Sequence, residues 1–292
     1  MRTTIQLIAI GLLGLGVGCG SDPGDGGNSD GDGGTDGRTD GGTGKDGGTG
    51  PRGDGGTLKC TELRLIIRDF KKTAFEASNR DSCDASCDFE HPLLSDDEGP
   101  DVAIPNIVQE TLGPERKPEY APSTWVGKEK IGGDGIKQIQ GPDTFKQWYT
   151  DDTKKLERVI SLTRNAMGRY EYDSAAFFPI DDDGHGSEGF DRLGNKHNFG
   201  FTTEVHTSFT YRGGEVFTFR GDDDLWLFIN DKLAIDLGGM HGPQEKTVDL
   251  DADKAKLGIE TGRRYKMDIF HAERHTTASN FRVETSIQCF ID

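Results

Sequence analysis

Residues 217–230 read FTFRGDDDLWLFIN, in which two apolar runs are separated by an acidic turn. The runs, Glu215–Phe219 and Leu225–Ile229, have the length and the aromatic and β-branched content of strands. A third run, Leu233–Leu237, follows Asn230-Asp231, a pair that tolerates positive φ and is typical of a tight hairpin. The three runs predict consecutive strands of an antiparallel sheet.

Strand-length apolar runs continue on both sides of this stretch. In Phe281–Ile287 apolar and polar residues alternate, which predicts one buried face and one solvent face. Many short strands at this spacing are typical of a β-sandwich, so we expect an all-β, antiparallel fold. Further strands are expected at Leu63–Ile67, Phe199–Tyr211, Thr247–Leu250 and Tyr265–Phe270.

Helical patterns are scarce. Asp69–Ala77 and Asp143–Tyr149 each predict a short helix. The segment Ser78–Lys137 is polar and rich in Pro, Asp and Glu, which predicts long surface loops. Residues 58–292 are therefore expected to form one large β-sandwich domain with a few short helices and long loops.

The acidic turn carries three adjacent carboxylates, Asp222, Asp223 and Asp224. Adjacent carboxylates raise one another's pKa unless a cation neutralises them. Clustered hard oxygens suit Ca²⁺, which takes six to eight oxygen ligands. The alternative is a solvated acidic turn without a metal.

Several stretches resemble the fibro-slime domain: 217–230, 232–242, 270–275 and 279–281, with fainter matches at 145–149 and 177–181. The resemblance covers most of the chain from about Leu63 to Ile287. The fibro-slime domain is similar to the PA-14 β-sandwich of protective antigen, a group that includes yeast adhesins and bacterial surface proteins that bind sugars. The resemblance thus implies a PA-14-like β-sandwich.

The resemblance also implies a site. In the wider group an Asp-Asp pair joined by a cis peptide binds Ca²⁺, and the metal then takes sugar hydroxyls. The register places this pair at Asp222 and Asp223, with Asp224 as a further possible ligand. A later loop is expected to add Asn280 first and Glu273 second. The implied sugar-binding residues are Asp222, Asp223, Asn280, His241, His271 and His275.

The N-terminal region has the pattern of an exported lipoprotein. The apolar run Ile5–Val17 is too short to span a bilayer and has the shape of a secretory signal over residues 1–18. Small residues before Cys19 resemble the bacterial lipobox, in which the cysteine is acylated; an ordinary signal peptide is the alternative. Residues 19–57 are rich in Gly and Asp and nearly devoid of apolar residues, so we expect a disordered linker.

The net charge of the chain disfavours some classes of binding partner. The formal net charge of −17 should repel nucleic acid and anionic membranes, which makes the lipid the expected membrane contact. Gly20, rather than Asp, follows Cys19, and by bacterial sorting habits this favours the outer membrane and the cell surface.

An even number of cysteines remains after Cys19, which in an exported chain favours disulfides. Three pairings are possible. We expect Cys60–Cys289, which flank the domain, and Cys83–Cys87 as a local bridge. Closing most of the domain would restrain the unfolded chain by about 4–5 kcal/mol on the loop-entropy model. A four-cysteine zinc site is the alternative, although the spacing is unusual for one.

Two further segments contain residues that could carry other chemistry. The segment His271–His275 differs from a zinc-protease motif because its Glu comes one position late. The acidic loop 179–186 lacks the Glu and the helical flanks of an EF-hand, and it is a solvated loop or a separate calcium site. We therefore predict a non-enzymatic, calcium-dependent carbohydrate-binding or adhesion module. The alternatives are a structural slime component without sugar binding and, less favoured, a glycoside hydrolase.

Overall fold

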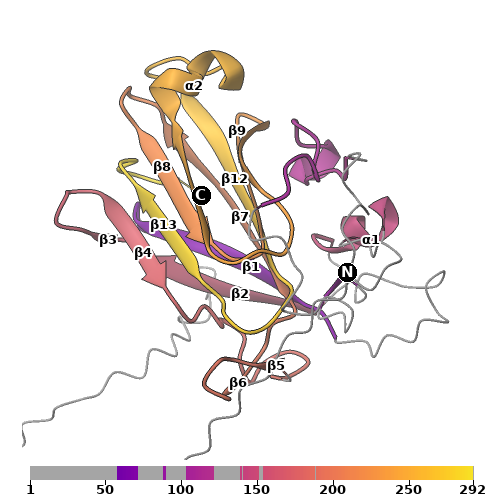
Figure 1. Cartoon of the computed structure of the whole chain (residues 1–292). Coiled ribbons are helices and arrows are strands. Elements are labelled where there is room, and N and C mark those ends of the chain that lie inside the picture. Colours follow the sequence, from indigo (N-terminus) through magenta and orange to yellow (C-terminus); the bar gives the residue numbers. More distant parts are fainter. Residues whose placement is uncertain are drawn as a thin grey trace, which may run out of the picture. The chain divides into compact units, whose positions relative to one another are not determined.

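Strands with one or two apolar faces pack into two antiparallel sheets in the computed structural model (Figure 1). The structure describes residues 58–71, 88–89, 103–121, 139, 141–150, 154–187 and 189–291. The predictions for Cys19, Cys83, Cys87 and the first 57 residues lie outside this part of the chain. All described residues belong to one compact unit, Lys45–Asp292.

The larger sheet has six strands and the smaller has five. In spatial order the larger sheet consists of β10 (Lys232–Leu237), β9 (Asp224–Ile229), β12 (Arg264–Glu273), β7 (Phe201–Thr210), β1 (Glu62–Asp69) and β2 (Lys154–Ser161). The smaller sheet consists of β11 (Gln244–Asp249), β8 (Val216–Gly221), β13 (Phe281–Thr285), β4 (Tyr170–Ser174) and β3 (Thr163–Arg164). All pairings in these sheets are antiparallel, which confirms the predicted fold class. A separate hairpin pairs β5 (Gly189–Phe190) with β6 (Lys196–His197).

The main core lies between the two sheets. Alternate residues of each strand point inward, as the period of two requires. Examples are Leu65 and Ile67 of β1, Phe217 and Phe219 of β8, and Val283 of β13, which are all buried.

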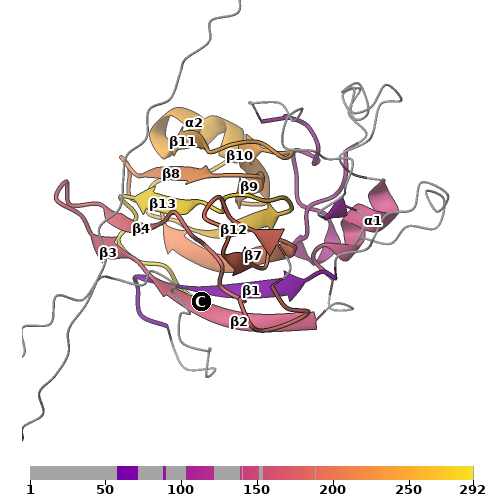
Figure 2. The same ribbon diagram turned by 60° about the horizontal axis from the view of Figure 1, so that its bottom comes forward.

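A second core covers the outer face of the larger sheet. It explains why all six residues of β9 are buried: Leu225, Leu227 and Ile229 join the main core, while Trp226 and Phe228 join the second one. The cover consists of residues 103–121, Phe89 and helix α1 (Pro142–Gln147), which Figures 1 and 2 both place beside the larger sheet.

The prediction of surface loops over Ser78–Lys137 is wrong for its described part, 103–121. Ile104, Ile107 and Val108 are buried against the sheet, and a short 3-10 helix, η3 (Pro114–Arg116), lies within the segment. The average polarity of the region concealed this apolar cluster. The apolar residues, and not the polar majority, determine where the segment packs.

One of the two predicted helices is confirmed, and the other is wrong at its start. The helix expected at Asp143–Tyr149 is confirmed as α1. The helix expected at Asp69–Ala77 is wrong at its start, because Asp69 is the last residue of β1 and pairs with Phe201. The sequence prediction also missed α2 (Leu250–Leu257), which Asp249 caps by accepting the backbone N–H groups of Asp251 and Ala252.

The predicted Cys60–Cys289 disulfide is confirmed, with the two Cα atoms 4.3 Å apart. It joins the chain just before β1 to the chain just after β13. No helix among the described residues is both long and apolar enough to cross a membrane.

Candidate functional site

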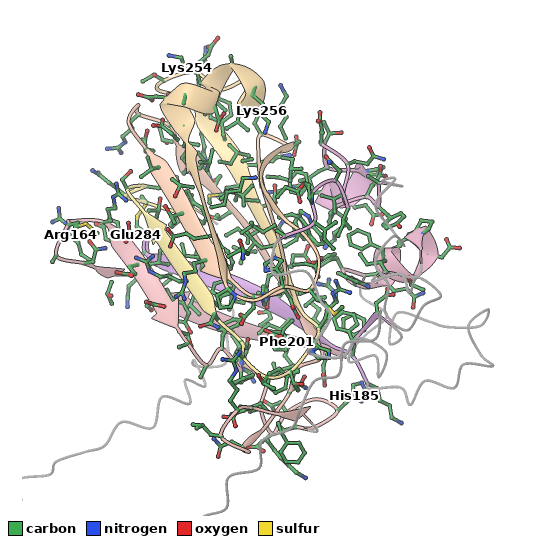
Figure 3. The ribbon with its side chains drawn as sticks, in the orientation of Figure 1. Arg164, His185, Phe201, Lys254, Lys256 and Glu284 are labelled. Carbon is green, nitrogen blue, oxygen red and sulfur yellow. A yellow bond between two sulfur atoms is a disulfide. The ribbon has the colours of Figure 1, made fainter. Side chains whose placement is uncertain are left out.

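Three connections between the two sheets meet at one end of the sandwich. They are Asp222–Asp223 between β8 and β9, Gly238–Pro243 between β10 and β11, and Arg274–Asn280 between β12 and β13. Figure 3 labels Phe201, which pairs with Glu273 at this end, and Lys254 and Lys256 of α2 at the opposite end. The fold therefore brings together residues more than 50 positions apart.

Asp222 is held by the β12–β13 connection. The side-chain amide of Asn280 donates to one Asp222 oxygen at 2.8 Å, and the backbone N–H of Asn280 donates to the other. Burial raises the pKa of Asp222, and the Asn280 hydrogen bonds oppose that effect. The two residues that sequence reasoning placed in one site are thus in direct contact.

Asp223 is held by backbone N–H groups from both neighbouring connections. Arg274 and His275 donate to Asp223 Oδ2 at 2.7 and 3.0 Å, and His241 donates to Oδ1 at 3.3 Å. Burial raises the pKa of Asp223 to about 6; the Arg274 charge opposes this, and the neighbouring carboxylates Asp222 and Asp224 add to it.

The expected cis bond between Asp222 and Asp223 is not present: this peptide is trans. Asp223 has a φ of 55°, so the chain makes its sharp turn through a left-handed residue instead. Asp tolerates this conformation better than most residues.

Asp224 is committed to a different partner. Its Oδ2 accepts the Nε–H of Arg274 at 2.6 Å and its Oδ1 accepts the N–H of Gly239 at 2.6 Å. Both members of the Asp224–Arg274 ion pair are fully buried. Contrary to the expectation of a further metal ligand, the carboxylate of Asp224 is therefore already engaged by a guanidinium.

Arg274 is the functional residue that sequence reasoning missed. Its guanidinium carbon lies 5.0 Å from the ring centre of Trp148, and its Nη1 donates to the carbonyl of Asp88 at 3.2 Å. Trp148 in turn donates to the carboxylate of Asp88 at 2.9 Å. Arg274 thus joins the acidic turn to the second core. The signal for it was the third Asp, because a buried carboxylate that binds no metal requires a cation.

Glu273 is the last residue of β12 and is fully buried. Neither of its carboxylate oxygens accepts a hydrogen bond, because the Ser279 hydroxyl, which lies close enough to influence the Glu273 pKa, donates to the carbonyl of Phe177 instead. Burial raises its pKa well above the usual value, and the charges of Asp223 and Asp222 raise it further. An unpartnered buried carboxylate beside two others is energetically unfavourable, and a proton or a metal cation would relieve it.

The carboxylates at this site are the type of ligand that Ca²⁺ binds, but their side chains do not converge on one point. Asp222, Asp223 and Glu273 offer hard oxygen donors, as Ca²⁺ requires. Within the described residues, however, no three His, Cys, Asp or Glu side chains already converge as a metal site. Binding would therefore need the carboxylates to turn toward one point.

His271 lies in the main core and not in a ligand pocket, contrary to expectation. Its ring is within 6.5 Å, centre to centre, of the rings of Phe177, Phe201, Phe219 and Phe281. Burial lowers its pKa to about 3, so the ring is neutral at ordinary pH. Neither ring nitrogen has a hydrogen-bond partner. The zinc alternative for His271–His275 finds no support in this placement.

His241 and His275 lie at the site, where their backbone N–H groups, and not their imidazole rings, bind the Asp223 carboxylate. The Nδ1 of His241 is 2.8 Å from the carbonyl of Gly242, and the Nδ1 of His275 is 2.6 Å from that of Thr276. Their N–H groups bind Asp223, as described above. A direct contact of either imidazole with a sugar stays a prediction.

The second acidic loop, 179–186, is braced by cations and amides. Asp183 accepts from Arg158 at 2.5 Å, and Asp181 accepts from the backbone of Asn198 at 2.8 Å and lies 2.5 Å from the ring of His197. Both carboxylates are already engaged by partners within the protein, which disfavours a separate calcium site there.

A known sequence family matches the part of the chain that contains these three connections. Residues 145–289 match the sequence model of the PA14 domain. The match includes Asp222, Asp223, Glu273 and Asn280. It supports the wider resemblance, whereas the fibro-slime and lipoprotein assignments stay predictions.

Curated relatives come from Dictyostelium discoideum. Protein psiC is 36% identical over 213 residues, which cover 68% of this chain and 38% of psiC. Protein psiD is 34% identical over 238 residues, which cover 77% of this chain and 45% of psiD. The chain thus spans less than half the length of these relatives.

Solved structures show only a distant similarity. The epithelial adhesin 6 A domain of Candida glabrata, solved with Galβ1-3GlcNAc, has a TM-score of 0.26 and 10% identity, covering 81% of this chain and 84% of that one. A β-glucosidase from Kluyveromyces marxianus has a TM-score of 0.21 and 13% identity, covering 29% of this chain and 11% of that one. Both TM-scores are too low to indicate a shared overall fold.

Proposed function

We propose that the domain is a calcium-dependent carbohydrate-binding or adhesion module without catalytic activity. One observation carries the proposal: Glu273 is fully buried with both oxygens unpartnered, beside two further carboxylates that burial has made harder to ionise. A divalent cation relieves all three at once. The PA14 match supports the same function.

Asp222, Asp223 and Glu273 would hold the metal. Asn280 orients Asp222, and the backbone N–H groups of Arg274, His275 and His241 orient Asp223, so two of the three carboxylates are positioned in advance. Calcium takes more oxygens than three side chains supply, and it would bind a pair of sugar hydroxyls at the remaining positions.

The domain would act at a cell surface. This part of the proposal rests on the sequence of residues 1–57, where an apolar signal precedes Cys19 and a Gly- and Asp-rich linker follows it. Lipid at Cys19 would supply the membrane attachment that a strongly acidic protein lacks.

Isothermal titration of the folded domain with Ca²⁺ tests the metal site. We expect wild type to bind one Ca²⁺ and Asp223→Asn to bind none. Asp231→Asn is the matched control, since Asp231 also lies in a turn with positive φ and Asn tolerates that conformation. A flat wild-type titration, or unchanged binding by Asp223→Asn, contradicts the proposal.

A glycan array probed with and without chelator tests the ligand. Calcium-dependent binding to at least one glycan class is expected, and Asp223→Asn should lose it. Calcium binding without any glycan binding would instead indicate a structural metal.

A further inference from the structure

The β5–β6 hairpin, Gly189–His197, exposes apolar side chains on an otherwise acidic protein. Phe190 is 51% exposed and Leu193 is 86% exposed. The Nζ of Lys196 lies 5.7 Å from the centre of the Phe190 ring. The hairpin therefore carries an aromatic face and an adjacent cation, both of which solvent can reach.

The charge of the hairpin surface is positive. Asp191 is held within the hairpin, because its carboxylate accepts the backbone N–H groups of Leu193 and Asn195 at 2.9 and 2.7 Å and lies 3.4 Å from Nε2 of His197. Arg192 and Lys196 are exposed. Among residues 189–197, Arg192 and Lys196 are exposed, whereas the one carboxylate is hydrogen-bonded within the hairpin.

The base of the hairpin is fixed to the domain. The His197 ring stacks on Phe178 with ring centres 3.8 Å apart, and it lies 2.5 Å from the carboxylate of Asp181. Such anchoring limits the entropy lost when a ligand binds the hairpin.

The hairpin also contacts the β12–β13 connection, part of which lines the proposed calcium site. Arg192 Nε donates to the hydroxyl of Thr277 at 3.0 Å, and a Cβ on Gly189 would approach Thr276 to 3.0 Å. Thr277 lies two residues beyond His275, whose N–H binds Asp223, and two residues span at most about 7 Å. Figure 1 shows β5 and β6 at the end of the sandwich at which β12 ends, and Figure 3 labels Phe201 at that end.

We propose that the hairpin Gly189–His197 binds a second, anionic sugar residue next to the one held at the calcium. The inference rests on the proposed function. Phe190 would pack against the apolar C–H face of the pyranose ring, and Arg192 and Lys196 would pair with a carboxylate or another acidic substituent. The ligand class is thus an acidic glycan rather than a neutral one.

Affinity measurements on a matched pair of ligands test this inference. The probes are a glucuronate-containing tetrasaccharide and its neutral, carboxyl-reduced counterpart, each titrated into calcium-loaded protein. Wild type should bind the acidic probe about tenfold more tightly. Phe190→Ala should weaken both probes by roughly 5- to 10-fold, the scale of an aromatic contact. Arg192→Ala should weaken the acidic probe alone.

Two control variants lie in the β3–β4 hairpin, at the end of β3 and in the turn that follows it. Met167 is 72% exposed and matches Phe190; Arg164, labelled in Figure 3, is exposed and matches Arg192. Met167→Ala and Arg164→Ala should bind both probes as wild type does, and every variant should bind Ca²⁺ normally.

Failure of this inference differs from failure of the proposed function. Equal binding of the two probes by wild type, no binding of the acidic probe, or hairpin variants that match wild type would overturn the inference while calcium titration and glycan array still succeed. Loss of wild-type calcium binding would overturn the proposed function and, with it, the inference.

Discussion

Arg274 serves the acidic turn in two ways. Its guanidinium neutralises Asp224, and its backbone N–H helps to orient Asp223. Because Asp224 forms the buried ion pair with this guanidinium, we do not count it among the carboxylates that would hold a metal under the proposed function. A single residue thereby distinguishes Asp224, which has a structural partner, from the carboxylates of the proposed metal site.

Removing the Arg274 guanidinium should leave Asp224 buried and unpaired. We expect Arg274→Met to lower the free energy of unfolding by about 3–5 kcal/mol, measured by urea denaturation. The double variant Arg274→Met/Asp224→Asn should recover part of the loss, because no buried charge remains. A loss below about 1 kcal/mol in the single variant would contradict the assigned pair.

At the residue scale, the sequence predicted which residues meet at the acidic turn but not which partner each carboxylate takes. The Asp222–Asp223 pair and Asn280 were predicted together, and they are in contact. The sequence could not show that Asp224 faces Arg274, nor that the His271 ring enters the main core. Residues two positions apart share one face of a strand, so the sequence places His271 and Glu273 on the same face of β12. The sequence alone does not show that the smaller sheet covers this face.

At the element scale, a charged cluster holds segment 103–121 on the larger sheet. Glu204 and His206 lie on β7 and Asp268 on β12, and their partners include Lys117 and Arg116 from the segment. Arg68 of β1 donates to Glu204 at 2.6 Å. His206 therefore lies between two carboxylates that also bind the cover of the sheet.

Titration of this cluster should make stability depend on pH. Burial disfavours the charged form of His206, but hydrogen bonds and charges of Asp268 and Glu204 outweigh it and raise the His206 pKa above 6.5. Its contribution is complete below pH 6.5 and is lost as pH rises through the raised pKa. For Glu204, burial is outweighed by His206 and Lys117, which lower its pKa from 4.5 to about 2. That contribution is complete above pH 4.5 and is lost as pH falls toward 2.

His206→Gln should therefore remove a stabilisation that exists at pH 6 and is absent at pH 9. We expect the variant to be less stable than wild type by about 2 kcal/mol at pH 6, the value of hydrogen bonds to charged groups, and to approach wild type at pH 9. Thermal unfolding of both proteins across this range gives the comparison. A difference that does not change with pH would show that His206 acts by packing alone.

At the same scale, the strands were predicted where apolar residues dominate and missed where they do not. β2 and β4, with the sequences KKLERVIS and YEYDS, contain many charged residues. β2 is an edge strand, and β3 pairs with only Tyr170 and Glu171 of β4, which leaves the rest of β4 at the edge of the smaller sheet. Edge positions favour such residues, since charges discourage pairing with other chains.

For the whole molecule, the disulfide is the main covalent restraint on the domain. Cys60 and Cys289 are 229 positions apart, so the closed loop takes in nearly all of the domain. On the loop-entropy model such a crosslink stabilises the fold by about 5 kcal/mol.

The double variant Cys60→Ser/Cys289→Ser should lose most of this stabilisation. Urea denaturation of the variant, compared with oxidised and reduced wild type, measures it. The variant and the reduced wild type should unfold at the same urea concentration, well below that of the oxidised protein. Coincident curves for all three would show that the sheets alone account for the stability.

The same crosslink has a mechanical consequence. Cys60 precedes β1, and β1 ends at Asp69, which pairs with Phe201, the partner of Glu273 at the proposed ligand end. A pulling force between a surface tether and a held glycan would therefore run along β1. Its hydrogen bonds to β2 and β7 lie across that direction and would be loaded together in shear rather than peeled one by one. The disulfide would pass part of the tension to the chain after β13, so flow over a cell would strain both sheets at once.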